Sequence, residues 1–163
     1  MATITFKKGD EYLARLSKLD VMTRDKVVGP AIYTAAEIVA DEIRDQLNKI
    51  PTDEGFGTRD DPAKGPKKVQ KEGMARSLGI SSMQEDSKGF VNVKIGFDGY
   101  NSVKTKRWPK GQPNQMVARS VERGTSWMKG HKFVKKAVAA TNKQAVARMK
   151  QKVDQSIETI MKG

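Results

Sequence analysis

The sequence predicts an α+β fold, in which a small antiparallel sheet packs against a long helix in the N-terminal half and a long C-terminal helix. Residues 32–50 repeat apolar side chains every three or four positions, as an amphipathic helix does. Residues 91–97 alternate apolar and polar side chains, as a half-buried strand does. Residues 131–161 repeat the helical pattern, and 163 residues are enough for one domain with its own core.

The chain opens with a short strand and a short helix. Ile4 and Phe6 alternate with polar residues, which is typical of a strand. Asp10 can then cap a helix, because its side chain can accept a hydrogen bond from the free N–H groups of the first turn. The apolar positions of this helix are Leu13, Leu16 and Leu19.

The next helix has the strongest pattern in the chain. Its apolar positions are Ile32, Ala35 or Ala36, Val39, Ile43, Leu47 and Ile50, and its acidic outer face holds Glu37, Asp41, Glu42 and Asp45. Proline fits only the first turn of a helix without disturbing it, so we expect the helix to start near Pro30 or to be kinked there. Pro51 ends it.

An extended loop is predicted over about residues 52–69, since glycines and prolines there alternate with charged residues. Two interpretations are open: a loop that makes a functional contact, and a tolerated surface insertion. Its carboxylates lack the ligand spacing of a calcium loop, and we interpret them as solvating charges. They are Asp53, Glu54, Asp60 and Asp61.

The sheet is predicted to follow this loop. Gly73–Leu78 leads into Ile80 and Met83, and residues 91–97 form the best-defined strand. Turn signals at 98–99 and 109–113 bracket a third strand over Ser102–Trp108. The solvent face of this third strand carries Lys104 and Lys106.

Two helices complete the expected fold. Asn114 can cap a helix over 115–123, which Gly124 ends in a left-handed conformation. The last helix covers about 131–161. Its apolar stripe consists of Val134, Val138, Ala145, Met149, Val153, Ile157 and Ile160, and its outer face of Lys132, Lys135, Lys136, Lys143, Arg148 and Lys152.

Charge is unevenly distributed along the chain, whose net charge is +12. Residues 1–81 hold 14 basic and 13 acidic side chains, whereas residues 82–163 hold 17 and 6. A strongly basic half indicates a polyanion nearby, and DNA or RNA is the usual one. The alternative is a lysine-rich face that is only solvated.

Few residues could carry catalysis or hold a cofactor. His131 is the only histidine and there is no cysteine, so the chain alone cannot supply a zinc site with two histidines or a cysteine nucleophile. No nucleotide-binding glycine motif occurs. We therefore expect no enzyme, no metal and no cofactor. No apolar run approaches the roughly 20 residues of a membrane span, so no membrane association is expected.

Both tryptophans lie in basic stretches. Trp108 and Trp127 could stack on bases, as aromatic side chains do in proteins that bind single strands. They could also anchor a subunit contact, where tryptophan is over-represented. The second interpretation is favoured, because two tryptophans are too few to make a stacking surface.

The segment Met116–Ala137 contains a Glu-x-Gly-Thr-Ser turn followed by a basic helix. It resembles the tail-component family of long-tailed bacteriophages, the head-tail joining, neck and tail-completion proteins. The matching positions are Glu122, Gly124, Thr125, Ser126, Met128, Phe133 and Ala137, together with Gly73, Arg76 and Ser77 of an earlier element. The chain departs from the family's pattern at Lys132 and Lys136, where prolines are usual, and at Arg123, where an aromatic residue is frequent.

The resemblance implies a structural protein of the virion, assembled in the host cytoplasm, with residues 1–163 forming one neck or tail-completion domain. Identical subunits would form a closed ring, with six copies implied, at the head-tail junction or as a tail terminator. Its partners would be neck or connector proteins, the tail-tube protein and, without sequence specificity, packaged double-stranded DNA. The 52–69 loop would reach a neighbouring subunit.

The alternative function is a cellular nucleic-acid-binding protein that uses the basic C-terminal half. Either function would draw on basic and aromatic side chains as DNA-facing or interface positions. These are Lys104, Lys106, Arg107, Trp108, Trp127, Lys132, Lys135 and Lys136.

Overall fold

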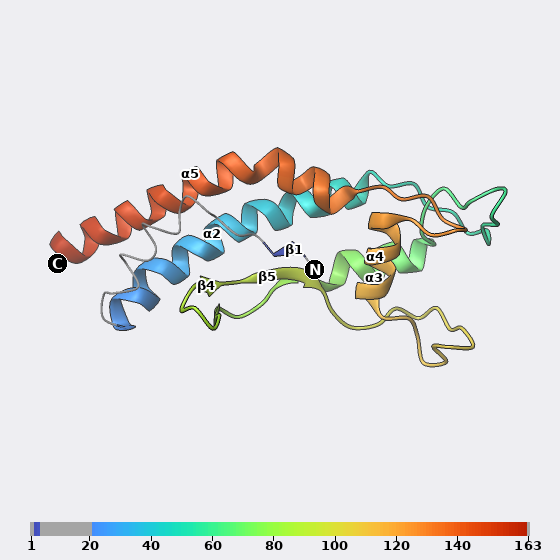
Figure 1. Cartoon of the computed structure of the whole chain (residues 1–163), viewed down its shortest axis with the longest axis horizontal. Coiled ribbons are helices and arrows are strands. Elements are labelled where there is room, and N and C mark those ends of the chain that lie inside the picture. Colours follow the sequence, from blue (N-terminus) through green and yellow to red (C-terminus); the bar gives the residue numbers. More distant parts are fainter. Residues whose placement is uncertain (1, 4–20, 163) are drawn as a thin grey trace. The chain divides into compact units, whose positions relative to one another are not determined.

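The computed structural model describes residues 2–3 and 21–162, and this part of the chain is α+β, with four helices and two small antiparallel sheets. It divides into two compact units. The first contains residues 40–79 and 96–140, and the second contains the described parts of 2–39, 80–95 and 141–163. Figure 1 shows the elements along the chain.

Helix α2 covers Val21–Asn48 and packs against the last helix, α5 (Phe133–Lys162) (Figure 1). The predicted apolar positions are confirmed, because all of them are buried, from Ile32 to Ile50, although α2 itself ends at Asn48. Of the two alternatives for Pro30, a helix that starts there is excluded, because α2 begins at Val21 and passes through this proline. The Pro30 side chain is exposed, so the ring does not displace any core side chain.

Helix α5 is confirmed, but its buried stripe begins one residue earlier than predicted. The buried positions are Phe133, Ala137, Thr141, Ala145, Met149 and Val153. Val134 and Val138 are only half-buried, and Ile160 is exposed. The buried residues recur every four positions, and a threonine among them obscured this stripe in the sequence.

Helix α3 (Lys68–Ser77) packs against helix α4 (Asn114–Arg123) in the first unit. The Gly73–Leu78 segment that was predicted to lead into the sheet is mostly helical, since Gly73 and Ser77 lie in α3 and the strand begins at Leu78. A Cβ at position 73 would lie 2.7 Å from Oδ1 of Asn114, so a glycine allows α4 to approach closely. The helix predicted over 115–123 is confirmed as α4, but Asn114 is its first residue and not its cap, which is Pro113.

The larger sheet has the strand order β1 (Ala2–Thr3), β5 (Lys94–Phe97), β2 (Leu78–Ile80). Ala2 pairs with Ile95 in antiparallel register. The second sheet is a hairpin of β3 (Gln84–Glu85) and β4 (Val91–Asn92). The strand predicted at 91–97 therefore exists in two pieces, β4 and β5. Most of the predicted opening strand and the whole helix of Leu13, Leu16 and Leu19 lie outside the described residues.

The third strand expected at Ser102–Trp108 is wrong, because this segment is an irregular loop. The Oδ1 atom of Asn101 accepts a hydrogen bond from the N–H of Val103 (2.9 Å). Thr105 and Trp108 then exchange backbone hydrogen bonds across a tight turn. These local bonds satisfy backbone groups that a strand would offer to a neighbour, which explains why the segment between the two turn signals is not a strand.

Candidate functional site: the turn before the last helix and the loops near it

Glu122, the glutamate of the Glu-x-Gly-Thr-Ser turn, caps the start of α5. Its Oε2 accepts a hydrogen bond from the N–H of Val134 (2.8 Å), and its Oε1 accepts one from the N–H of Lys135 (3.1 Å). The first N–H groups of a helix have no partner within the helix, and a carboxylate there also interacts favourably with the helix dipole. Glu122 thereby joins the end of α4 to the beginning of α5.

The residue before α5 is a lysine, where the family that the sequence resembles usually has a proline. Lys132 has a positive φ of 52°, and its N–H donates to the carbonyl oxygen of Glu122 (3.0 Å). Proline has φ fixed near −65° and no N–H, so it could not adopt this conformation or make this bond. The N–H of Lys136 also donates to the carbonyl oxygen of Lys132 (2.9 Å). Lysine at both positions therefore fits the entry to α5 that this chain adopts.

A tight turn follows α4. Gly124 ends this helix with φ 82° and ψ 166°, so its φ is positive as predicted, but it is not left-handed helical. The N–H of Thr125 donates to the carbonyl oxygen of Met128 (2.9 Å), which closes a turn with Ser126 and Trp127 at its corner. The chain then returns so close to Gly124 that a Cβ there would lie 2.8 Å from the nitrogen of Gly130. Glycine is required at position 124 for both reasons.

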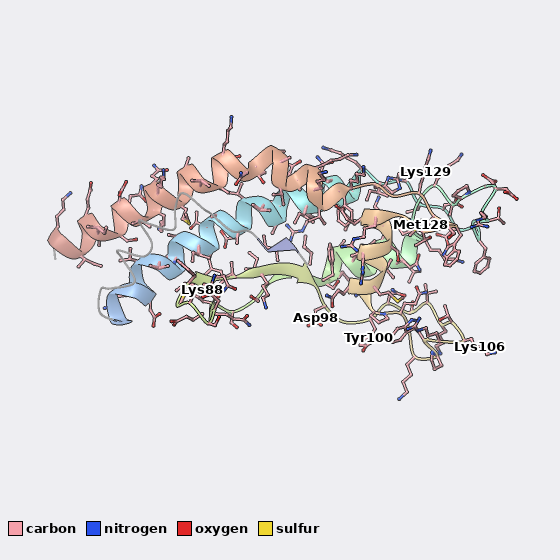
Figure 2. The ribbon with its side chains drawn as sticks, viewed as in Figure 1. Lys88, Asp98, Tyr100, Lys106, Met128 and Lys129 are labelled. Atoms are coloured by element: carbon pink, nitrogen blue, oxygen red, sulfur yellow. The ribbon has the colours of Figure 1, made fainter. Side chains whose placement is uncertain are left out.

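The 51–67 loop is attached to this turn. The N–H of Ala63 donates to the carbonyl oxygen of Trp127 (2.9 Å), and the N–H of Lys129 donates to the carbonyl oxygen of Ala63 (3.0 Å). A Cβ at Gly57 would collide with the Trp127 carbonyl oxygen. Nε2 of His131 donates to the carbonyl oxygen of Lys64 (2.8 Å). We call residues 51–67 and 124–131 together the double loop. Figure 2 labels Met128 and Lys129, which lie in its second segment.

Two acidic residues of the 51–67 loop accept hydrogen bonds from backbone N–H groups. Asp53 accepts hydrogen bonds from the N–H groups of Gly55 (2.9 Å) and Lys64 (3.0 Å), one on each carboxylate oxygen. The bond from Lys64, and after it the bond from Gly55, lowers the pKa of Asp53 below its ordinary value of 3.8. Glu54 accepts a bond from the N–H of Lys68 (2.7 Å) at the start of α3. The interpretation of these two carboxylates as solvating charges is therefore wrong, because each binds backbone.

The double loop exposes two large aromatic side chains. Phe56 is 89% exposed and Trp127 is 61% exposed. The Nζ of Lys67 lies 4.2 Å from the centroid of the Phe56 ring, within the range of a cation–π contact. Apolar rings of this size favour burial against another molecule, and tryptophan is enriched at the centres of protein interfaces.

Most motif residues that lie outside the Glu-x-Gly-Thr-Ser turn contribute to packing or to backbone hydrogen bonding. Phe133 and Ala137 are buried, and the ring of Phe133 packs edge-to-face with Phe97 at 6.0 Å between centroids. In the earlier element, the carbonyl oxygen of Ser77 accepts a bond from the N–H of Asp98 (3.1 Å). Arg76 is exposed. Gly73 and Ser77 therefore support the segment that enters the 98–114 region.

A buried asparagine pair in that region was not found from the sequence. Asn114 donates from Nδ2 to the carbonyl oxygen of Asp98 (3.0 Å), and Asn101 donates to Oδ1 of Asn114 (3.4 Å). Both side chains are buried. Each asparagine flanks a turn signal, but nothing in the sequence distinguishes a buried asparagine from one that only caps a helix.

The segment 96–140 carries many exposed, positively charged side chains. It holds ten lysines and arginines against two acidic residues, Asp98 and Glu122. All ten cations are exposed, and within the described residues none forms an ion pair. Of the eight predicted DNA-facing or interface positions, Trp127 lies on the double loop and the other seven lie in two groups. Lys104, Lys106, Arg107 and Trp108 lie on the 102–110 loop; Lys132 immediately precedes α5, and Lys135 and Lys136 lie in its first turn.

Within the described residues, no three His, Asp or Glu side chains are grouped so that they could hold a metal ion. None of the described helices is long and apolar enough to cross a membrane. Comparisons with known proteins find no match: no family model, no curated protein and no solved structure matches the chain.

Proposed function

We propose that this protein is a structural component of a long-tailed phage virion. Identical subunits would form a closed ring at the head-tail junction or tail end, where the ring joins or completes the tail around the DNA path. The proposal rests on the resemblance of Glu122–Ser126, Phe133 and Ala137 to the tail-component family. Contacts of a closed ring join two different surfaces of neighbouring subunits, so each subunit needs a protruding surface and a receiving one.

The observation that carries the proposal is the braced double loop with its two exposed aromatic rings. Hydrogen bonds between Ala63, Trp127 and Lys129 link its two segments, and the Asp53 carboxylate ties residues 55 and 64 together. A loop held by its own bonds loses less conformational entropy when it binds than a free one. A protruding, pre-ordered element with exposed Phe56 and Trp127 suits contact with a neighbouring subunit or tail protein.

Negative-stain electron microscopy of the purified protein, alone and mixed with the tail-tube or neck protein, tests the proposal. We expect rings from the wild type and loss of rings from the double variant Phe56→Ser, Trp127→Ser. Tyr100→Ser is the matched control, because Tyr100 is also largely exposed but lies outside the double loop. Wild-type protein that forms no ring under any of these conditions would reject the proposal.

A second function is favoured by the ten exposed, unpaired cations of residues 96–140. Lysine and arginine side chains that meet phosphates release bound counterions and give affinity that falls steeply with salt. A cellular nucleic-acid-binding protein would use this surface as a monomer or dimer. Binding of DNA or RNA by protein that never forms a ring would support this second function over the first.

A further inference from the structure

The 102–110 segment, which we call the basic loop, belongs to the first unit, and a backbone hydrogen bond joins its two ends. The N–H of Asn101 donates to the carbonyl oxygen of Gln112 (2.9 Å) where the loop begins and ends. The side chain of Gln112 accepts a bond from Gln70 of α3 (2.6 Å), which fixes this base to a helix. Nine residues project beyond it.

The tip of the basic loop presents two cations. Thr105 donates to the carbonyl oxygen of Trp108 (3.1 Å), and Trp108 donates back to that of Thr105 (3.0 Å). This reciprocal pair leaves Lys106 and Arg107 at the corner of the turn. Figure 2 shows Lys106 near the far end of the loop and Tyr100 nearer its base.

The charge on the basic loop is unopposed. Lys104, Lys106, Arg107 and Lys110 are all exposed, and the nine residues contain no acidic side chain. Within the described residues none of these four cations forms an ion pair. The cations are thus available to negative charge outside the chain, and no ion pair with another described residue has to be broken first.

We propose that the basic loop binds the phosphate backbone of duplex DNA without reading its sequence. The inference deepens the proposed function and rests on it, since a ring around packaged DNA would meet a duplex. The loop contains no Asn, Gln, Asp or Glu, which are the residues that recognise adenine and cytosine edges. Lysine and arginine contact phosphates, which positions a protein without specifying a base. The guanine edge that they can also recognise is reached in the major groove by a helix or a two-stranded β-ribbon, and the basic loop is neither.

The tryptophan of the basic loop favours a duplex over a single strand. Single-strand binders offer exposed aromatic faces on which bases stack. Trp108 is only half-exposed, and the guanidinium carbon of Arg107 lies 5.7 Å from the centroid of its ring. In this position Trp108 supports Arg107, whose N–H groups remain available to phosphate oxygens.

The test compares two triple variants that remove the same charge. Lys104→Gln, Lys106→Gln, Arg107→Gln changes the basic loop, and Lys143→Gln, Arg148→Gln, Lys150→Gln changes exposed positions of α5. Each removes two lysines and one arginine. Fluorescence anisotropy with a duplex of about 30 base pairs is measured from about 50 to 300 mM salt, because the slope of log K against log salt reports the number of phosphate contacts.

We expect the loop variant to reduce that slope by about 2 to 3 units and to weaken binding at about 0.1 M salt on the order of 100-fold. The α5 variant should change the slope by less than about 1 unit. Equal losses in both variants, or no wild-type binding at about 50 mM salt, would overturn the inference. A tighter complex with a single strand of the same length would overturn the choice of a duplex.

Ring formation is measured separately on the same proteins, without nucleic acid. If rings form and the loop variant binds DNA like the wild type, the inference fails and the proposed function stands. If no ring forms and the loop variant still loses DNA binding selectively, the proposed function fails. The basic loop would then be the contact surface of a nucleic-acid-binding protein.

Discussion

The carboxylate of Glu122 lies 2.8 Å from the backbone nitrogen of Val134, twelve residues further along the chain. Its second oxygen accepts the N–H of Lys135, so both oxygens bind the first turn of α5. The glutamate of the Glu-x-Gly-Thr-Ser turn therefore acts as a helix cap supplied from a neighbouring helix. It fixes where α5 begins, and with it the return of the chain through residues 124–131.

Replacing Glu122 with alanine is expected to lower the free energy of unfolding by about 1 to 2 kcal/mol, because a helix cap is lost and two N–H groups lose their partner. Glu122→Gln, which keeps one acceptor oxygen, should lose about half as much. Urea unfolding followed by circular dichroism measures both. Glu72→Ala, which changes an exposed glutamate of α3, is the control and should stay within about 0.5 kcal/mol of the wild type.

Gly57→Ala is expected to displace the 51–67 loop from the 124–131 turn, since the added methyl group would collide with the carbonyl oxygen of Trp127. We expect a loss of roughly 1 to 3 kcal/mol and faster hydrogen exchange at the N–H of Ala63, which donates to that same oxygen. Gly79→Ala is the matched control, because nothing lies within 4 Å of a Cβ there. Unchanged exchange at Ala63 in the Gly57 variant would contradict the attachment of the two segments.

Asp53 links pH to the order of the double loop. Its folded pKa is lowered below 3.8 by hydrogen bonds from Lys64 and Gly55. A lowered pKa means that the carboxylate stabilises the fold above the ordinary value and loses this effect as pH falls through the folded pKa. The amide signal of Lys64 should therefore titrate by NMR with a midpoint below 3.8. In Asp53→Asn this titration should vanish, whereas in Asp60→Asn it should persist; a wild-type midpoint at or above the ordinary value would refute the account.

Lys71 is expected to stabilise the end of α2. Its Nζ donates to the carbonyl oxygen of Asn48 (2.8 Å), the last residue of α2, which has no partner further along the helix. It also donates to the carbonyl oxygen of Ile50 (2.6 Å), two residues beyond the helix. A cation at a helix C-terminus also interacts favourably with the dipole. Lys71→Met should cost about 1 to 2 kcal/mol in thermal unfolding. Lys68→Met, at an exposed position of α3, should change stability little; equal effects of the two substitutions would argue against this role for Lys71.

The sequence predicted those elements whose pattern depends on burial of one face. The stripe of α2 and residues 145, 149 and 153 of α5 are examples, since a long run of apolar side chains at helical spacing is typical of a helix with one buried face. Helix α3 was missed because its only buried residues are Gly73 and Met74, which leave no repeating apolar face to detect. Its position depends on α4 and on the bonds of Lys68 and Lys71 to distant residues.

The candidate site was only partly predictable. The Glu122 turn and the 52–69 loop were each identified from the sequence, but their attachment through Ala63 and Trp127 was not. The attachment consists of backbone hydrogen bonds, which any residue except proline can both donate and accept, so the side chains do not reveal it in the sequence. The strand expected at Ser102–Trp108 failed for a related reason, because Asn101 and the Thr105–Trp108 turn satisfy the backbone locally.

The mass of the nuclease-treated protein in solution decides whether this protein forms a closed ring. Sedimentation equilibrium would be measured at about physiological salt, first for the protein alone and then with the tail-tube or neck protein. A closed assembly at a fixed multiple of the 18.1 kDa chain mass, either alone or formed on one of these partners, is the predicted result. A monomer that associates with neither partner, yet binds DNA or RNA with a steep salt dependence, would contradict the ring and favour the nucleic-acid-binding alternative.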